Sequence, residues 1–184
     1  MNRIYLLFIA LAFHVGIHAQ EASPIRWMTL EEAVKAQQKE PRKIIMDAYT
    51  NWCGPCKMLD KNTFHNKDVA DYINKNFYPV KFNAEGNDEI TFQGKNFTNP
   101  NYDPARSNSR NSQHELAGYL GVRAYPTVVF LDESAALLFP LVGYQDPNQL
   151  ELYLKLFATD AYKDITTKEQ FEQYIKDFKA EFQP

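Results

Sequence analysis

The sequence predicts a single α/β domain in which a central mixed sheet is flanked by helices. Two short apolar runs, residues 43–49 and 77–83, are typical of strands and are separated by segments with helical periodicity. Two later runs, from 126 and from about 136 to 142, are joined by a tight turn and predict an antiparallel hairpin. The chain has 184 residues, of which 45% are hydrophobic and 14% aromatic, so it can bury one ordinary core.

The first half of the domain opens with a helix and a buried strand. Thr29 and Glu32 form a possible capping box, so we expect a helix from this point to about residue 39. The strand at 43–49 is apolar except for one acid, Asp47, and such a run is typical of a strand that is covered on both faces. An acid at that place requires an explanation.

Two helices and a long insertion follow. A helix is expected from Pro55 and a second one over residues 67–76, each with apolar residues at helical spacing. Residues 85–113 are rich in Asn, Ser, Gly and Pro, and only a small hairpin across Gln93 and Gly94 is expected within them. A loop of this length inside a domain is usually functional or disordered.

The last third predicts a short helix at about 114–120, the hairpin, and two more helices. Asp146 before a proline caps the first of these, and Thr167 begins the second. Aromatic and aliphatic residues at helical spacing predict that the final helix docks on the domain through one face. This stripe comprises Phe171, Tyr174, Ile175, Phe178 and Phe182.

The N-terminal residues have the composition of a secretory signal peptide. Arg3 precedes an apolar run at 4–15, and the small Ala19 stands before Gln20. An uncleaved membrane anchor is the alternative, but the run is shorter than the ~20 residues that a spanning helix needs. We therefore expect residues 1–19 to be removed near Ala19–Gln20 and the mature chain to lie in the periplasm without stable membrane insertion.

The charge pattern favours neither a nucleic-acid nor an anionic-membrane partner. The net charge is −3, and charges of both signs are spread along the chain without long runs of one sign.

The only two cysteines, Cys53 and Cys56, stand in the motif WCGPCK. A structural disulfide stabilises mainly by closing a long loop, and a bridge between these two closes almost none. Close spacing instead suits a bond that opens and closes repeatedly. The pair is therefore predicted to be redox-active.

The two sulfurs are expected to have different tasks. A strand and a short link place Cys53 at a helix N-terminus, where free N–H groups and the helix dipole favour the thiolate, so its pKa should lie below the ~8.5 of a free thiol. Cys53 is the predicted nucleophile. Cys56, one turn further along, should be less exposed and should resolve the mixed disulfide.

A zinc site is the alternative for this pair, because Cys-x-x-Cys is also half of a common metal site. It would need two further ligands, and the mature chain offers only His65 and His114. Both histidines are expected at loop or cap positions. We predict no metal and no cofactor.

WCGPCK follows an apolar strand, Asp47 stands six residues before the first cysteine, and YPT stands about 70 residues after the second. On these residues the chain resembles the thioredoxin family over about residues 43–157. The resemblance implies the thioredoxin fold, with the long insertion before the cis-proline strand and an extra C-terminal helix outside the common core. It suggests a thioredoxin-like domain over 20–160, with the insertion at about 85–113, and a helical extension over 161–184.

The family also implies roles for further residues. Pro126 would follow a cis peptide bond that places the Tyr125–Pro126 backbone beside the sulfurs, where an extended substrate can pair with it; a strand-initiating proline is the alternative. Trp52, Gly54 and Pro55 would contribute to the substrate surface.

Asp47 matches the buried carboxylate that exchanges a proton with the second cysteine, and Lys81 matches the lysine beneath it. A buried carboxylate has a raised pKa, which suits a general base. The alternatives are an ordinary strand residue for Asp47 and a solvated face for Lys81.

The resemblance finally implies a direction of electron flow. Gly54–Pro55 is the dipeptide of reducing thioredoxins, and the segment after it is closer to exported bacterial thioredoxin-like domains. We expect a periplasmic thiol–disulfide oxidoreductase that reduces or isomerises disulfides of exported proteins. Since the chain has no nucleotide fingerprint, a membrane thiol-reductant donor must recharge it.

Two alternatives remain open at this point. One is a dedicated reductase for a single client such as apocytochrome c, which the long insertion would suit if it covers or extends the binding groove. The other is a non-catalytic module that binds proteins through the same groove.

Overall fold

The computed structural model describes residues 24–183 and is built on a four-stranded mixed sheet. Its strands are β1 (Lys43–Tyr49), β2 (Phe77–Asn83), β5 (Thr127–Leu131) and β6 (Leu137–Val142), in the order β2-β1-β5-β6. β1 pairs with β2 in parallel, whereas β5 is antiparallel to both β1 and β6. The predicted mixed sheet and hairpin are confirmed.

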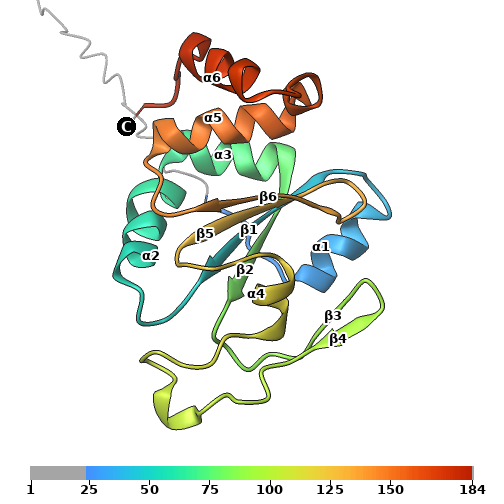
Figure 1. The fold of residues 1–184 in the computed structure, drawn as a ribbon, viewed down its shortest axis with the longest axis vertical. Coiled ribbons are helices and arrows are strands. Elements are labelled where there is room, and N and C mark those ends of the chain that lie inside the picture. The colour runs from blue at the N-terminus through green and yellow to red at the C-terminus, as the bar shows by residue number, and fades with distance from the viewer. Residues whose placement is uncertain (1–23, 184) are drawn as a thin grey trace, which may run out of the picture.

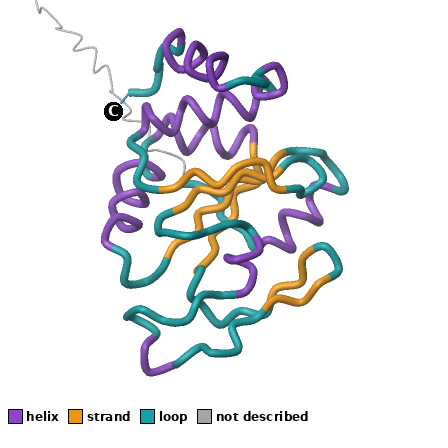
Figure 2. Tube along the Cα trace, viewed as in Figure 1, coloured by secondary structure: helices purple, strands orange, loops and turns teal. Residues whose placement is uncertain are grey.

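Helices cover both faces of this sheet (Figure 1). On one side lie α1 (Leu30–Gln37) and α4 (Glu115–Tyr119), and on the other α3 (Lys67–Asn76) and α5 (Pro147–Ala158). Figure 2 shows the same layers, with the strands between two groups of helices. α2 (Gly54–Leu59) begins at the cysteine motif and continues into a π-helical segment, η1 (Asp60–Phe64).

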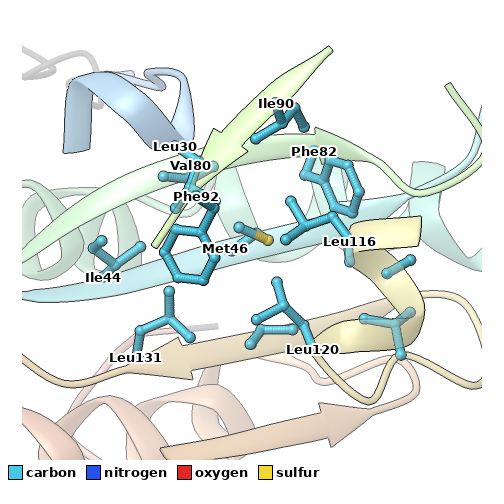
Figure 3. Close-up of a cluster of buried hydrophobic side chains, with 14 of the residues drawn as sticks. Leu30, Ile44, Met46, Val80, Phe82, Ile90, Phe92, Leu116, Leu120 and Leu131 are labelled. Carbon is cyan, nitrogen blue, oxygen red and sulfur yellow. The ribbon is translucent and has the colours of Figure 1, made fainter. Parts of the chain in front are cut away.

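The core has two halves, because successive residues of β1 point to opposite faces. Ile44 and Met46 face α1 and α4, in the half that Figure 3 shows, while Ile45 faces α3 and α5. Every residue of β1 from Lys43 to Ala48 is buried. The expectation of a strand covered on both faces is confirmed, and Asp47 lies in it with only 1% exposure.

Helix starts follow the capping signals of the sequence. The Thr29 side chain accepts from the Glu32 N–H while the Glu32 carboxylate accepts from the Thr29 N–H. Asp146 and Thr167 begin α5 and α6 (Lys168–Asp177) with the same reciprocal arrangement. Each cap satisfies backbone N–H groups that have no partner within the helix.

The insertion at 85–113 is folded against the domain. Its first part forms the predicted hairpin, β3 (Ile90–Phe92) and β4 (Lys95–Phe97), whose turn has positive φ angles at Gln93 and Gly94. Ile90, Phe92 and Phe97 are buried in the core half that contains α1 and α4. The second part is loop with one 3-10 turn, η2 (Pro104–Arg106).

The C-terminal segment packs less deeply than its aromatic stripe predicts. α6 has no buried residue, Ile175 is 44% exposed, and the helix ends before Phe178 and Phe182. The reason is that α5 already covers the sheet, so α6 lies on the outer side of α5 (Figure 1). The Tyr153 and Phe171 rings make one contact between these helices, with centroids 6.4 Å apart.

Instead, hydrogen bonds to the buried carboxylate of Glu151 hold the C-terminal residues in place. Glu151 on α5 is fully buried and accepts hydrogen bonds from the backbone N–H groups of Glu181 and Phe182, each at 2.9 Å. Lys155 Nζ lies 2.7 Å from the same carboxylate. The last residues are thereby tied to the middle of the domain.

The predicted signal peptide, residues 1–19 with its cleavage point, lies outside the described residues. Within residues 24–183, none of the helices is both long enough and apolar enough to cross a bilayer.

Candidate active site

The two cysteines form a disulfide at the start of α2. Cys53 is the N-cap residue, with extended backbone angles, and its Cα lies 5.3 Å from that of Cys56. The backbone N–H of Cys56 donates a hydrogen bond to Cys53 Sγ at 3.1 Å. Pro55 occupies the first helical turn, where the absence of its N–H costs little. The expected position of Cys53 at a helix N-terminus is confirmed.

The expected difference in exposure between the cysteines is wrong for the disulfide form. Cys53 is 2% exposed and Cys56 is 4% exposed. In so short a bridge each sulfur covers the other, so neither cysteine projects from the surface.

A second loop lies beside the motif. The Tyr125–Pro126 peptide bond is cis, as the resemblance implies, and immediately precedes β5. The Trp52 and Tyr125 rings meet edge to face with centroids 6.1 Å apart. Trp52 and Tyr125 are half-buried whereas Gly54 is exposed, so the surface next to the disulfide has an aromatic wall.

Asp47 and Lys81 are brought together by strand register. They are direct partners in the parallel pairing of β1 with β2, and Lys81 Nζ lies 2.8 Å from Asp47 Oδ2. The contact is an ion pair rather than an aligned hydrogen bond, and neither carboxylate oxygen accepts a hydrogen bond from residues 24–183. The Lys81 side chain is thus paired with a buried carboxylate while 26% of it remains exposed.

Burial sets the protonation of this pair. Loss of water raises the pKa of the Asp47 carboxyl above its ordinary value, and the nearby Lys81 ammonium opposes that rise only in part. Burial lowers the pKa of Lys81, but its ion pairs with Asp47 and Asp60 leave that pKa above the ordinary value. The ammonium also lies 4.8 Å from the centre of the Trp27 ring.

Asp47 and Cys56 border one cavity of about 290 Å³, together with Lys81 and Asp60. The three buried side-chain oxygens without a hydrogen-bond partner in residues 24–183, two on Asp47 and one on Thr50, belong to residues that line it. A cavity of this volume, lined by charged side chains as well as apolar surface, admits several water molecules. The buried carboxyl and the second cysteine therefore border the same space.

Sequence reasoning missed Asp60. Its Oδ1 lies 2.5 Å from Lys81 Nζ, so the ammonium sits between a buried and a partly exposed carboxylate. The signal was available, because Asp60 follows Cys56 by four residues and side chains at that spacing share a helix face.

Glu85, at the start of the insertion, was also missed, and no sequence pattern marks it. It is 8% exposed, and its Oε2 accepts hydrogen bonds from Trp52 Nε1 at 2.7 Å and from the Asn111 N–H at 2.8 Å. Glu85 thereby joins the active-site tryptophan to the far end of the insertion.

The histidines lie at helix ends. His114 is the N-cap of α4, where Nδ1 accepts from the Leu116 N–H and Nε2 lies 2.8 Å from the Asp88 carbonyl oxygen. His65 is the C-cap residue of η1. Both were expected at such positions. In residues 24–183 no group of three or more His, Cys, Asp and Glu side chains is arranged to hold a metal ion.

Three features together define a dithiol–disulfide protein of the thioredoxin fold: a mixed sheet, a Cys-x-x-Cys pair at a helix start, and a cis-proline loop whose Tyr125 ring contacts Trp52. The family model of the thioredoxin-like domain matches residues 30–158. The chain therefore belongs to the thioredoxin-like family.

Relatives of known sequence agree with this assignment. A thioredoxin of Mycoplasmoides gallisepticum is 25% identical over 114 residues, which are 62% of this chain and 83% of that protein. The thiol:disulfide interchange protein DsbD of Pectobacterium atrosepticum is 24% identical over 125 residues. That match spans 67% of this chain but only 18% of the DsbD protein.

Solved structures show the same fold. A putative disulphide-isomerase of Bacteroides thetaiotaomicron is 31% identical with a TM-score of 0.51, covering 76% of this chain and 97% of that one. A thioredoxin-fold protein of Helicobacter pylori is 23% identical with a TM-score of 0.57, covering 74% and 83%. The predicted thioredoxin fold with an extra C-terminal helix is confirmed.

The chain is accordingly a thiol–disulfide oxidoreductase with Cys53 and Cys56 as its CxxC pair. This sets aside the alternative of a non-catalytic binding module.

Proposed function

We propose that this protein is a periplasmic reductase of disulfides in exported proteins, working through a dithiol–disulfide cycle of Cys53 and Cys56. The observation that carries the proposal is the Cys56 N–H that points at Cys53 Sγ from the start of α2, because a donor and a helix N-terminus favour a thiolate at that sulfur.

In the reduced form the Cys53 thiolate attacks one sulfur of the target disulfide. A bond forms between Cys53 and that sulfur, and the other target sulfur leaves as a thiolate. Asp47, with its raised pKa, takes the proton of the Cys56 thiol through the shared cavity, and the Cys56 thiolate then attacks Cys53 Sγ. The protein closes its own disulfide, the second target sulfur leaves, and the target has gained two electrons.

Lys81 has a positioning role in this scheme. Its ammonium lies 2.8 Å from Asp47 and 2.5 Å from Asp60, and it limits the rise in the pKa of the buried carboxyl. Asp47 then ionises readily enough to act as a base. Trp52, Gly54, Pro55, Tyr125 and Pro126 form the surface that receives the target chain.

Three features support the reducing direction and the compartment. Gly54–Pro55 is the dipeptide of reducing thioredoxins, the N-terminal residues have signal-peptide composition, and one relative carries the name thiol:disulfide interchange protein. A reductant outside the cytoplasm needs an electron supply, for which we propose a membrane thiol-reductant donor.

A narrower function, reduction of one client such as apocytochrome c, is favoured by one observation. The insertion meets the active-site loop directly, since Asn51 Nδ2 donates to the Ser107 carbonyl oxygen at 2.9 Å. A wall at that place limits which folded targets can approach the sulfurs.

The test has two parts. In equilibrium with glutathione, the CxxC pair should have a potential near the ~−270 mV of reducing thioredoxins, and a value near ~−120 mV would contradict the reducing direction. A Cys56→Ser variant expressed with its own N-terminal residues should hold clients as mixed disulfides, with the Cys53→Ser/Cys56→Ser double variant as control.

The captured set decides between the two functions. Many exported proteins support a general reductase, and one dominant client supports the dedicated one. Mass spectrometry of the recovered protein also tests the compartment, because the proposal requires a mature chain that begins near Gln20. Recovery of the unprocessed chain from the cytoplasm alone would contradict it.

A further inference from the structure

The second half of the insertion forms one surface with the active-site loop. Ser107 accepts from Asn51, two residues before the first cysteine, and Asn111 and Trp52 both donate to Glu85. The thioredoxin-like framework alone does not require any of these contacts, because they come from residues 85–113. The insertion therefore lies where it can contact a target protein that approaches the disulfide.

Side-chain amides hold this loop in one shape. Asn99 is 5% exposed and donates to the carbonyl oxygens of Gly86 at 2.9 Å and Ser112 at 2.8 Å, which joins the two ends of the loop. Further along, Asn111 and Asp103 exchange two hydrogen bonds, at 3.0 and 2.8 Å. Buried hydrogen bonds of this kind fix the backbone, so residues near the tip have defined positions.

A pocket of about 430 Å³ lies between the insertion and the cis-proline loop. Its lining residues are Trp52, Glu85, Arg110, Arg123, Ala124 and Tyr125. Arg110 comes from the insertion and Arg123 from the turn before Tyr125, so the two guanidinium groups belong to different segments of the chain. The Arg110 guanidinium carbon lies 5.0 Å from the centre of the Trp52 ring.

The charges of this pocket are not balanced. Both arginines are exposed, and within residues 24–183 neither has a carboxylate at ion-pair distance. The one carboxylate of the lining, Glu85, already accepts from Trp52 and Asn111. Burial together with the Glu85 charge raises the pKa of Tyr125 to about 12, so its hydroxyl remains a neutral hydrogen-bond donor.

We propose that this pocket, lined by Arg110 and Arg123, is a subsite for an acidic side chain of the target, close in sequence to the cysteine under attack. The inference rests on the proposed function, since it takes the Tyr125–Pro126 backbone as the place where the target chain lies. Guanidinium groups bind carboxylates through charge-assisted, often bidentate hydrogen bonds, and stacking of Arg110 on Trp52 orients one of them. The protein then prefers disulfides with a nearby aspartate or glutamate.

The test uses peptides that contain one intramolecular disulfide and have acetylated and amidated ends, so that only a side chain can supply a carboxylate. The peptides differ at a single position next to a cysteine, which carries aspartate, asparagine or lysine. The rate constant for their reduction by the fully reduced protein is measured in single turnovers at low and high salt. We expect the aspartate peptide to react about fivefold faster than the asparagine peptide at low salt, and this ratio to shrink as salt increases.

In the Arg110→Gln/Arg123→Gln variant the ratio of the aspartate-peptide rate constant to the asparagine-peptide rate constant should fall to about one. Arg106→Gln is the matched control, because it removes the same charge from the same insertion but from a residue that does not line the pocket. Arg110→Glu/Arg123→Glu should reverse the preference toward the lysine peptide. Urea unfolding of each variant checks that its fold persists.

The outcomes separate the two levels of inference. Equal rates for all three peptides with the unaltered protein, or an aspartate preference that survives loss of both arginines, overturn the subsite and leave the proposed reductase intact. Failure to reduce any of the peptides, with insulin also left oxidised, overturns the proposed function and with it the subsite.

Discussion

Replacement of Asp47 by asparagine gives the sharpest test of the site chemistry. Asp47→Asn keeps the size of the side chain but removes the group that can gain or lose a proton. Asp47 is 1% exposed, and its oxygens have no hydrogen-bond partner in residues 24–183. The charges that act on it are the Lys81 ammonium at 2.8 Å and the Asp60 carboxylate, which pairs with the same ammonium. The substitution therefore isolates the consequences of a buried ionisable carboxyl.

The first consequence is on stability. Burial raises the pKa of Asp47 in the folded protein above the value of 3.8 expected for the unfolded chain. Below pH 3.8 both states are protonated and the carboxyl makes no difference. As pH rises through this value the unfolded chain ionises first, so the folded protein loses stability by up to ~1.4 kcal/mol per pH unit until the pH exceeds the folded pKa.

Asp47→Asn should therefore gain stability over the unaltered protein across that window and keep the gain at higher pH. The assay is urea unfolding of the oxidised protein at a series of pH values. Asp71→Asn is the matched control, because Asp71 is a partly exposed acid on α3 that pairs with Lys67. A difference between Asp47→Asn and the unaltered protein that does not change with pH would refute the assignment of a raised pKa.

The second consequence is on the resolution step. Without a base near Cys56, attack on the mixed disulfide should slow by about 10²-fold near neutral pH, in the range usual for general base catalysis. The difference between the two rates should shrink as the pH rises, because hydroxide then removes the thiol proton without Asp47. Stopped-flow measurement of the decay of a preformed mixed disulfide tests this. Identical pH profiles for the two proteins would refute the role of Asp47, whatever its pKa.

Three further substitutions test other contacts. Lys81→Met removes the cation that lowers the pKa of Asp47, so the pH at which the resolution step accelerates should move upward, and an unmoved profile would exclude that coupling. Glu151→Gln places an amide N–H₂ group against backbone N–H donors and should lower the free energy of unfolding by about 1–3 kcal/mol. Glu151→Gln should also make the C-terminal residues susceptible to protease, while the variant continues to reduce insulin. If the C-terminal residues stay protected from protease, Glu151 does not hold them in place. Asn99→Ala removes two donated hydrogen bonds and should lower the free energy of unfolding by about 1–3 kcal/mol. Cleavage by protease within residues 100–110 should therefore increase. Unchanged cleavage would show that other contacts order the loop.

Several parts of this protein were predictable from local sequence. β1, α3 and β2 begin and end where their apolar patterns predict, and capping residues such as Thr29 and Asp146 mark helix starts. These signals are local, because the apolar period and the satisfaction of terminal N–H groups involve only neighbouring residues. The motif WCGPCK likewise identified the redox pair, since a bridge between two cysteines so close together closes almost no loop and the mature chain offers few further metal ligands.

Other predictions needed more than local pattern. The acid in β1 was noticed, but its pairing with Lys81 follows from the register of two strands that are more than 30 residues apart in the sequence. The aromatic stripe near the C-terminus predicted a docked helix, and its shallow packing could not be foreseen because it depends on α5 already covering the sheet. A hydrophobic face indicates that a helix packs, but not how deeply.

Residue pattern was enough to predict the α/β architecture, the position of the cysteines at a helix start and the chemistry available to them. The surroundings of those sulfurs became visible only in the folded chain: Asp60 paired with Lys81, Glu85 hydrogen-bonded to Trp52, and Arg110 with Arg123 in the lining of one pocket. The interactions of a charged side chain depend on which other side chains lie within a few ångströms of it in the folded protein. In residues 85–113 the positions of the side chains depend on a network of amide hydrogen bonds, and no periodic sequence pattern predicts such a network.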